Sequence, residues 1–295
     1  MKGILNIYKL PGMTSHDVVN KIRRTIGMKK VGHTGTLDPL AEGVLPICIG
    51  EATKISQFII EKDKEYITEL LLGSQTDTYD KTGSVTQESN SIPLEKDISQ
   101  ALEEFEGDIL QVPPIYSAIK VSGKKLYEYA RENKKVEIQP RKITIHTIVL
   151  LNYQYPVVKL KIHCSKGTYI RSICNDLGEK LGSFAHMSTL IRTKSGPFCM
   201  EKGIPLDDLD AMDCDKIEAL LYPMDYPLNH LRSVGIKESA SKYLLNGNTL
   251  VQKNCSQDLS QLSIGESVRL YLNHQFKGIG EITPNYAIKT LRIFK

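Results

Sequence analysis

The sequence predicts a mixed α and β fold (α+β) with a small β-rich unit at its C-terminal end. Three runs have the apolar alternation or density typical of strands: 64–73, 143–151 and 157–164. Apolar residues at helical spacing predict helices in three places: 18–26, 97–106 and 168–181. Beyond these, the turn Asn246-Gly247-Asn248 and several short β-like runs predict a separate β unit.

Length and composition fit this division. The 295 residues are enough for one large domain or one large plus one small, and 41% hydrophobic with 24% charged residues is an ordinary globular composition. The proline-flanked stretch 223–227 is a plausible boundary, so we expect one domain over 1–230 and another over 231–295. The net charge of +4 is compatible with a nucleic-acid partner but does not require one.

Several classes of protein are disfavoured by what the sequence lacks. The six cysteines form no CxxC pair, which argues against a structural zinc site and against a disulfide scaffold. There is no Walker loop and no GxGxxG, so no nucleotide cofactor is indicated. No signal peptide is visible, and no run approaches the about 18 apolar residues of a membrane span. We therefore expect a cytoplasmic protein with no cofactor, no metal and no membrane association.

One stretch carries most of the chemical information: Gly32-His33-Thr34-Gly35-Thr36-Leu37-Asp38-Pro39-Leu40-Ala41-Glu42-Gly43-Val44-Leu45. Proline steers the residue before it away from helical angles, so Asp38 should lie in extended backbone on a defined loop. The apolar run 44–49 then predicts a buried strand. A carboxylate on a stiff loop beside a core strand is a candidate catalytic group. The alternative is a turn in which Asp38 only bonds its own backbone.

Four further blocks occur along the chain, and together with this stretch they are the basis of a resemblance to a known family. They are Thr76-Asp77-Thr78-Tyr79-Asp80 ending in Gly83, the segment Gln111–Arg131 with its Pro113-Pro114-Ile115-Tyr116-Ser117-Ala118, the run Cys164-Ser165-Lys166-Gly167-Thr168-Tyr169-Ile170-Arg171-Ser172, and the segment Ala185–Phe198. In wording and order the five blocks resemble the motifs of the TruB family of tRNA pseudouridine synthases. The resemblance covers roughly 3–198 strongly and the remainder weakly.

Two positions depart from the family pattern. In the turn after Lys9 the proline lies two places after the lysine, where the family has it one place after, so the resemblance does not imply the fine geometry of this turn. Ile191 stands where the last block of the family usually has its first arginine, so a family contact to RNA or within the fold is expected to be missing.

The resemblance implies a fold and a set of catalytic residues. The fold is that of pseudouridine synthases, with a mainly antiparallel central sheet flanked by helices and a small PUA-like β domain at the C-terminal end. Asp38 falls on the catalytic aspartate of the family, and Arg171 on the arginine that pairs with it. Tyr66 takes the place of the active-site tyrosine, although a strand tyrosine is more often simply packed in a core.

Three more residues are implied for the substrate. His33 falls on the histidine that occupies the gap left by the flipped uridine, and Tyr169 and Leu190 fall on residues that line the uridine pocket. The reaction breaks the N1–C1′ bond, turns the base and rejoins it through C5, with no redox change. It needs an ionised carboxylate, and pairing with Arg171 would lower the pKa of Asp38. Tyr66 is the candidate for helping to remove the C5 proton. Whether Asp38 acts as a nucleophile or as a base on the sugar stays open.

A basic, tyrosine-containing segment follows in the middle of the chain. Between Lys120 and Lys142 there are eight basic and three acidic residues, interleaved with tyrosines. In the family this region, about 111–142, belongs to an insertion that closes over the RNA, and such a composition fits a segment that grips phosphates and stacks on bases. The alternative is an amphipathic helix with solvated lysines.

The resemblance therefore implies an isomerase that acts on the T-arm of tRNA and converts the T-loop uridine customarily numbered 55. We expect a monomer with no obligatory protein partner. One alternative is a guide-RNA-dependent synthase of the dyskerin type that acts on rRNA, but the extensions that would bind extra proteins are not visible. The other is a noncatalytic tRNA-folding chaperone, which would not need Asp38, Tyr66 and Arg171 together.

Overall fold

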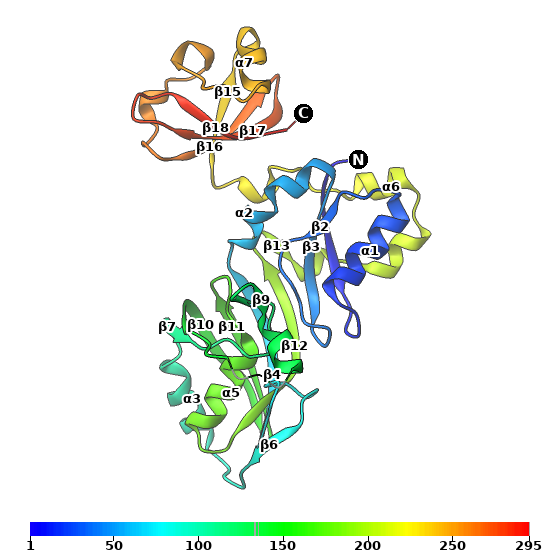
Figure 1. The fold of residues 1–295 in the computed structure, drawn as a ribbon, viewed down its shortest axis with the longest axis vertical. Helices are drawn as coiled ribbons and strands as arrows, with labels where there is room; N and C mark the ends of the chain where they lie inside the picture. The colour runs from blue at the N-terminus through cyan, green and yellow to red at the C-terminus, as the bar shows by residue number, and fades with distance from the viewer. Residues whose placement is uncertain (133, 135, 295) are drawn as a thin grey trace.

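The computed structural model describes residues 1–132, 134 and 136–294, which form a large sheet-based unit and a smaller β unit (Figure 1). The large unit contains a ten-stranded sheet in the described part of the chain. Eight strands follow the order β14 (Ile204–Pro205), β1 (Gly3–Lys9), β3 (Glu42–Ile49), β12 (Ala185–Ser195), β4 (Lys64–Leu72), β11 (Val157–Cys164), β10 (Arg141–Gln154) and β7 (Gly107–Gln111). The short strands β2 (Val31–His33) and β13 (Phe198–Cys199) pair with β3 and β12.

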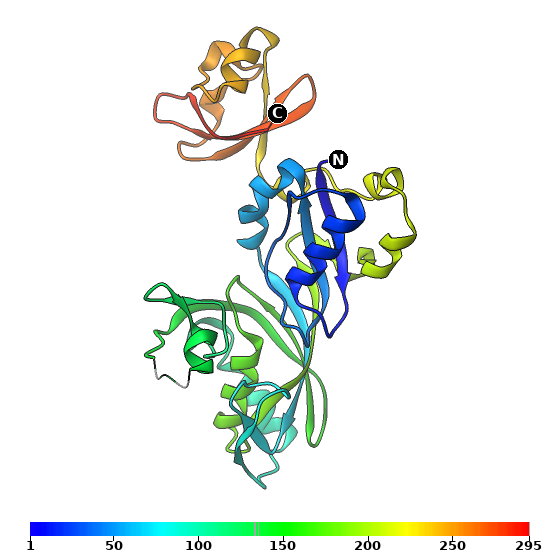
Figure 2. The ribbon, with the colours of Figure 1, turned by 45° about the vertical axis from the view of Figure 1, so that its right-hand side comes forward.

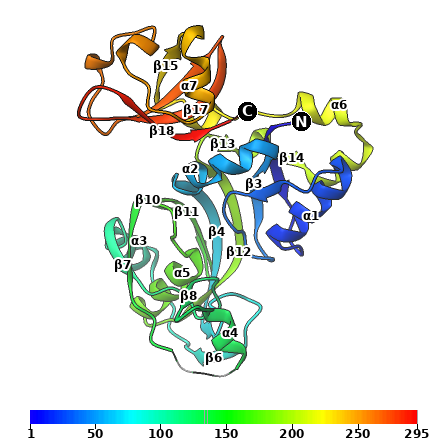
Figure 3. The ribbon, with the colours of Figure 1, turned by 45° about the horizontal axis from the view of Figure 1, so that its top comes forward.

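Most neighbours in this sheet are antiparallel, and the parallel pairs are β1 with β14 and β3 with β12. Helices pack on the sheet near its two ends (Figures 1 and 3). Their bounds are α1 (Ser15–Ile26), α2 (Ser56–Ile60), α3 (Glu95–Glu103), α4 (Leu126–Arg131), α5 (Ile170–Lys180) and α6 (Cys214–Ala219). The predicted mixed fold with a mainly antiparallel sheet is therefore confirmed. None of the described helices is long and apolar enough to cross a membrane.

Local sequence explains why α1 starts and stops where it does. The Thr14 side chain accepts a hydrogen bond from the Asp17 backbone N–H, and the Asp17 carboxylate accepts one from the Thr14 N–H in return, which forms a capping box. Gly27 ends the helix at a φ of 65°, where a side chain would be strained. Val18 and Ile22 are fully buried on the inner face. The helix predicted over 18–26 and its stop at Gly27 are thus confirmed.

Strand β4 keeps the strict alternation that its sequence predicted. Lys64, Tyr66, Thr68, Leu70 and Leu72 are all buried, while the residues between them are partly exposed. Because successive side chains of a strand point to opposite faces, this pattern fixes which face is the core. That core face packs against α5, and it also presents the Tyr66 side chain to the cavity described below.

Three predicted bounds shift in the structure. The helix expected over 97–106 is α3 and ends at Glu103, because the chain turns into β7 at Gly107, which has a φ of 89°. Helix α5 begins at Ile170 and Tyr169 is its N-cap residue, so only Arg171 of the two lies in the first turn. Strand β10 is longer than 143–151, since its polar ends pair with β7 and β11 and register shifts interrupt its alternation.

In the described residues of the segment 111–142 there is no long helix. The segment holds a two-stranded hairpin of β8 (Lys120–Val121) and β9 (Lys124–Lys125), followed by α4, and it stands beside the sheet in the lower part of Figure 2. Much of its charge is engaged locally: the ammonium group of Lys124 lies 5.1 Å from the ring centre of Tyr129 and pairs with Glu132. Lys135, one of the eight basic residues counted above, lies outside the described residues.

A further hairpin, β5 (Ser74–Thr76) with β6 (Val85–Glu88), extends from the end of β4. The small unit contains a four-stranded sheet in the order β15 (Arg232–Ile236), β16 (Ser267–Leu272), β17 (Gln275–Ile282) and β18 (Ile288–Ile293), with helix α7 (Ser241–Leu245) beside it. It has its own apolar core, which includes Val234, Leu244 and Leu270. The division into 1–230 and 231–295 stays a prediction.

The two units are not independent, because a third apolar cluster joins them. This seam contains Ile4, Val44 and Phe198 from the large unit and Ile279 and Phe294 from the small one, all nearly or completely buried. Polar contacts border it: the Tyr271 hydroxyl donates to the Asp225 carboxylate, and an Arg269 guanidinium nitrogen donates to the Asn229 side chain at 2.8 Å. The small unit is therefore fixed to the large one by a packed interface as well as by a linker.

The seam makes a prediction about stability. Phe294→Ala removes a side chain that is 1% exposed, so it should lower the free energy of unfolding by about 3–5 kcal/mol. Unfolding in urea would be followed by amide hydrogen exchange, which reports on the residues of each unit separately. Because the seam serves both units, their transitions should shift together. Ile264→Ala, which alters a side chain 56% exposed, is the control and should change stability little. A loss confined to the small unit would contradict the coupling.

Candidate active site

A cavity of about 670 Å³ opens beside the centre of the large sheet. Its walls come from the Asp38 loop, from β4 and β12, from the segment 111–142, and from the turn that leads into α5. Five of the six residues singled out in the sequence line it: Asp38, Tyr66, Tyr169, Arg171 and Leu190. They come from places far apart in the chain, and the sheet brings them together.

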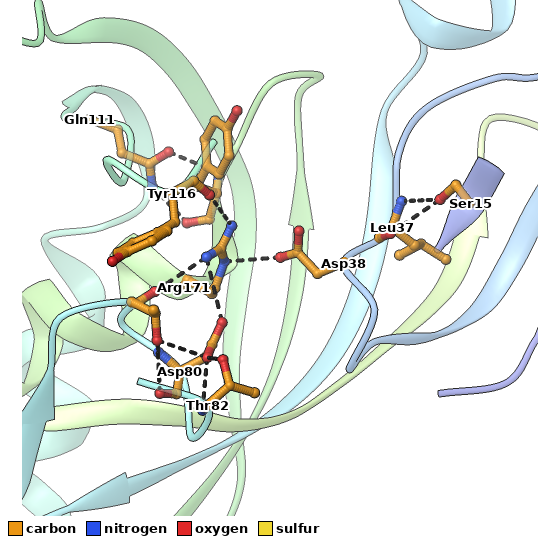
Figure 4. Close-up of polar contacts among 10 residues, drawn as sticks. Ser15, Leu37, Asp38, Asp80, Thr82, Gln111, Tyr116 and Arg171 are labelled. Atoms are coloured by element: carbon orange, nitrogen blue, oxygen red, sulfur yellow. Dashed lines mark hydrogen bonds and ion pairs between the residues drawn. The ribbon is translucent and has the colours of Figure 1, made fainter. Parts of the chain in front are cut away.

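The loop that carries Asp38 is held on both sides. Before Asp38, the Leu37 backbone N–H donates to the Ser15 hydroxyl at 2.8 Å, and that hydroxyl donates back to the Leu37 carbonyl at 3.1 Å (Figure 4). After Asp38, the buried ammonium group of Lys9 donates to the carbonyls of Pro39 at 3.3 Å and Ala41 at 2.6 Å. The backbone on either side of the carboxylate is therefore fixed.

A second buried cation supports the same loop from below. The Arg192 guanidinium donates to the carbonyls of Val44 at 2.7 Å, Gly35 at 3.3 Å and Thr36 at 3.5 Å. It can reach them because β12 runs next to β3, with Gly43 opposite Arg192. A Cβ atom at Gly43 would lie 2.3 Å from the Arg192 carbonyl oxygen, and the φ of Gly43 is 109°. Only glycine allows this approach.

Arg171 is the hub of the site. Its Nε lies 2.9 Å from a carboxylate oxygen of Asp38, and its side chain is 7% exposed. Nη1 donates to the Thr78 carbonyl at 3.2 Å and lies 3.5 Å from an oxygen of Asp80, while Nη2 donates to the Tyr116 carbonyl at 3.1 Å. One planar group thus connects four segments, as Figure 4 shows. Arg171 contacts Asp38 through Nε and not by a two-pronged fork.

Asp80 is itself fixed, so it can serve as an anchor for Arg171. One carboxylate oxygen accepts hydrogen bonds from the Thr82 backbone N–H at 2.9 Å, from the Thr82 hydroxyl at 2.5 Å and from the Thr78 hydroxyl at 2.9 Å. The other oxygen faces Arg171. The side chain is almost completely buried. Two carboxylates, Asp38 and Asp80, therefore share one guanidinium.

Of the other predicted residues, Tyr169 and Leu190 line the cavity and His33 does not. Tyr169 is held by Gln111, whose side chain accepts from the Tyr169 N–H at 2.8 Å and donates to its carbonyl at 3.0 Å. Leu190 is 7% exposed and lies in the wall of the cavity. His33 is the exception: it ends β2 at the start of the Asp38 loop and is not among the cavity-lining residues.

Comparison with known proteins agrees with this geometry. Residues 23–170 match the profile of the "TruB family pseudouridylate synthase (N terminal domain)", and residues 171–229 match that of the "tRNA pseudouridylate synthase B C-terminal domain". The tRNA pseudouridine synthase B of Alkaliphilus oremlandii is 47% identical over 280 residues, which cover 95% of this chain and 93% of the relative. The chain belongs to the TruB family. The resemblance found in the sequence is thereby confirmed.

Other relatives of this TruB-family chain extend the comparison. The tRNA pseudouridine synthase B of Clostridium kluyveri is 42% identical over 295 residues, which is the full length of both chains. Among solved structures, a chain of a Cbf5-Nop10-Gar1 complex superposes with a TM-score of 0.76 and 29% identity, covering 99% of this chain and 85% of that one. The likeness to pseudouridine synthases thus extends over both units of the fold.

The protonation of Asp38 differs from the expectation. Pairing with Arg171 does favour the carboxylate, but burial is the larger effect, and the nearby Asp80 charge acts in the same direction as burial. The pKa of Asp38 is therefore raised above its usual 3.8. A third of the Asp38 side chain surface remains exposed, and that part faces the cavity. The prediction that Arg171 would leave Asp38 with a lowered pKa was wrong, because it omitted the cost of removing the carboxylate from water.

Burial also sets the state of two other groups. It raises the pKa of Tyr66 to about 12, against the opposing effect of Arg192, so the phenol keeps its proton at neutral pH. It lowers the pKa of His33, with the charges of Arg192 and His16 adding to the effect, so the neutral imidazole is favoured. A neutral ring can enter a stack of bases at a smaller desolvation cost than a charged one.

Sequence reasoning missed three charged residues that hold this TruB-family site in place: Lys9, Asp80 and Arg192. Each lies inside or next to a family block, and each is almost completely buried. Charged side chains are rarely buried unless they have partners. A charged residue inside an otherwise apolar run, as Lys9 is after the strand 4–8, was the available signal.

The electrostatics predict a titration. In ¹³C NMR, Asp38 should titrate above 3.8, and Asp80→Asn should lower its pKa because a like charge is removed. The Asp38→Asn spectrum identifies the signal. A raised pKa means that ionising Asp38 costs folding stability, so the wild type should lose stability relative to Asp38→Asn as the pH rises through that pKa. Asp77→Asn, at an exposed neighbour, is the control. An Asp38 pKa at or below 3.8 would contradict the analysis.

Proposed function

We propose that this protein is a tRNA pseudouridine synthase that isomerises uridine 55 in the T-loop of tRNA, with Asp38 as its catalytic carboxylate. The observation that carries the proposal is the contact between Asp38 and Arg171 at the wall of a cavity large enough for a flipped nucleotide. The relatives named tRNA pseudouridine synthase B, which match nearly the whole chain, support tRNA as the substrate.

Because Asp38 lines the cavity, it would act there on the sugar or the base of a bound uridine. As a nucleophile its oxygen would bond to the sugar as the N1–C1′ bond breaks, and that bond would break again when C5 attacks C1′. As a base it would instead take a proton from the sugar and return it when the C5–C1′ bond forms. Both routes need the ionised form. Arg171 favours that form and holds the carboxylate in one orientation, while burial leaves it poorly solvated and therefore reactive.

Tyr66 is the candidate for handling the C5 proton. With a pKa of about 12 it is protonated at neutral pH, so it can accept the C5 proton only as its own proton leaves. We infer a relay: the hydroxyl oxygen takes the proton from C5 and gives its hydrogen to solvent, after which the base is reprotonated at N1. The net reaction is an isomerisation, and protons lost and gained are equal.

The other predicted residues would hold the flipped uridine and the helix that it leaves. Extruding a base costs a few kcal/mol of stacking, which something must offset. We assign Tyr169 and Leu190 to the walls around the uridine, since both line the cavity. We assign His33 to the gap in the T-loop, because it lies at the edge of the same loop as Asp38 and its neutral ring is favoured.

The tRNA itself would be gripped outside the cavity. Arg141 lies in the cavity wall, is exposed, and has no carboxylate partner among the described residues, so it is our candidate for a phosphate contact. By contrast, the Lys64 ammonium, also in the wall, is bound to the carbonyls of Ile60 and Lys62. The segment 111–142 and the PUA-like domain over 231–295 would add contacts to the T-arm and beyond.

The alternatives are tested by the same arrangement. A noncatalytic tRNA-folding chaperone would not need Asp38 beside a buried arginine, with Tyr66 in the same wall. The likeness to the chain of the Cbf5-Nop10-Gar1 complex, at 29% identity, is weaker support for a guide-RNA-dependent enzyme acting on rRNA. The relatives with 42–47% identity carry the tRNA name. We propose that the protein acts as a cytoplasmic monomer without an obligatory protein partner.

The proposal predicts that the protein alone modifies tRNA. Incubated with an unmodified tRNA transcript, it should form pseudouridine at position 55, mapped by chemical labelling and sequencing. Asp38→Asn should lower the single-turnover rate at least about 1,000-fold, since an essential catalytic group is lost, yet leave tRNA binding largely intact. A transcript with cytidine at position 55 is the substrate control. Failure of the wild type to modify any transcript without a guide RNA would overturn the proposal.

Arg171→Lys should be severely impaired as well. Lysine can supply one charge to Asp38, but it cannot also donate to Thr78 and Tyr116 in a fixed plane. We expect single-turnover rates to fall about 100- to 1,000-fold, as for the loss of one preorganised donor. Arg24→Lys, an exposed change on α1, is the matched control. A near-normal rate in Arg171→Lys would mean that the four-segment contact is unimportant for turnover.

A further inference from the structure

Two histidines and an aspartate gather on the face of the sheet that turns away from the active-site cavity. Asp63 comes just before β4, His146 lies on β10 and His163 on β11. Their ligand atoms all lie within 4.8 Å of one another. The His146 Nε2 is 3.2 Å from an Asp63 oxygen, and the two imidazole centres are 4.7 Å apart with a tilt of 43°.

A β-bulge brings His146 into this cluster. Across β10 and β11, Ile145 pairs with Cys164 and Thr147 pairs with His163, so His146 is an extra residue with no partner of its own. As a result His146 and Thr147 are both exposed, while Ile145 and Ile148 on either side are buried. In a regular strand, neighbouring residues would point to opposite faces. Bulges commonly re-aim side chains in this way.

The backbones that carry the three side chains are fixed. His163 sits in the middle strand of the β10–β11–β4 ladder, opposite Glu65. The Asp63 carbonyl accepts a hydrogen bond from the Gly196 N–H at 3.0 Å, which ties it to the end of β12. Because His163 alternates with the buried Ile162 and Cys164, its ring lies on the face opposite the cavity.

The surrounding charges leave the cluster free to take a cation. The nearest acidic neighbour in the ladder, Glu65, is already engaged: it accepts from the Thr193 hydroxyl at 2.8 Å and pairs with Lys161 at 3.2 Å and Lys194 at 3.7 Å. Glu65, Lys161 and Lys194 together keep a net charge of +1, but both ammonium groups lie at Glu65 and neither pairs with Asp63. The Asp63 carboxylate brings a negative charge to the two imidazoles.

We propose that Asp63, His146 and His163 bind a divalent late first-row transition metal ion, with Zn²⁺ as the occupant. Imidazole and carboxylate are zinc ligands at about 2.0–2.2 Å, which puts two ligand atoms of a tetrahedral site about 3.3 Å apart. The His146–Asp63 pair already has this separation, and rotation of the partly exposed His163 ring brings in the third ligand. Three protein ligands leave one position for water.

This cluster escapes a search by cysteine spacing, since it uses no cysteine and its members are far apart in sequence. A metal here would clamp the chain before β4 to the bulge in β10. Strand β4 carries Lys64 and Tyr66 into the cavity wall on the other face. A bound metal would therefore stabilise the sheet from the face opposite the cavity. This proposal does not depend on the proposed function.

The test uses the full-length protein stripped with chelator and titrated with Zn²⁺ by calorimetry and with Co²⁺ by visible absorption. The wild type should bind one equivalent, and Co²⁺ should give the d–d bands of a nitrogen and oxygen site without a thiolate charge-transfer band. His146→Ala, His163→Gln and Asp63→Asn should each weaken Zn²⁺ binding by at least about 10- to 100-fold, the range for losing even a supporting residue.

Two controls and one stability measurement separate this site from others. Cys214→Ser removes an exposed thiol, and His274→Asn removes an exposed histidine while tolerating its φ of 62°; both should bind Zn²⁺ like the wild type. Zn²⁺ should raise the Tm of the wild type but not that of the folded His146→Ala/His163→Gln double variant. Equal Zn²⁺ binding by the double variant and the wild type, loss of binding in Cys214→Ser, or no binding at all would overturn the proposal.

Discussion

The site depends on one buried guanidinium. Arg171 is removed from water, and a buried charge is tolerated only where partners compensate it. Its partners are Asp38 and Asp80 together with the carbonyls of Thr78 and Tyr116. These partners come from the Asp38 loop, the turn after β5 and the segment 111–142, and Arg171 itself lies on α5. Satisfying this single side chain therefore requires that the sheet place all four segments correctly, which links folding to the assembly of the site.

The charge around the Asp38 loop is unbalanced in a way that suits a polyanionic substrate. Lys9, Arg171 and Arg192 are three buried cations, against the two carboxylates of Asp38 and Asp80. Lys9 and Arg192 donate their hydrogen bonds to backbone carbonyls of the loop. These bonds position the backbone but do not neutralise the two positive charges. The surplus holds Asp38 nearer to ionisation than burial alone would allow, and RNA phosphates can supply the missing negative charge. Stability and reactivity of the site are thus set by the same groups.

Much of the fold could be predicted from the spacing of apolar residues, because the buried face of a helix or strand requires apolar residues at regular intervals. The alternation in β4 and the capped apolar face of α1 are examples. Such spacing does not predict the strand order, the bulge at His146 or the close approach of Gly43 to Arg192. These features depend on partners distant in the chain. For the site, the family motifs predicted that Asp38 and Arg171 pair. They did not predict the raised pKa of Asp38, which depends on how deeply the loop is buried.

The seam between the two units bears on how the small unit could influence catalysis. Val44 connects the seam to the Asp38 loop. Its side chain lies in the shared apolar cluster, and its carbonyl accepts the 2.7 Å hydrogen bond from Arg192 that supports the loop. Cores are close-packed, so a shift of the small unit against β3 cannot be absorbed without moving this strand. The seam therefore gives the small unit a physical connection to the loop that carries Asp38, in addition to any contact with RNA. Phe294 and Ile279 share an apolar cluster with Val44 of β3, so the small unit is better described as part of the scaffold around the Asp38 loop than as an appended module.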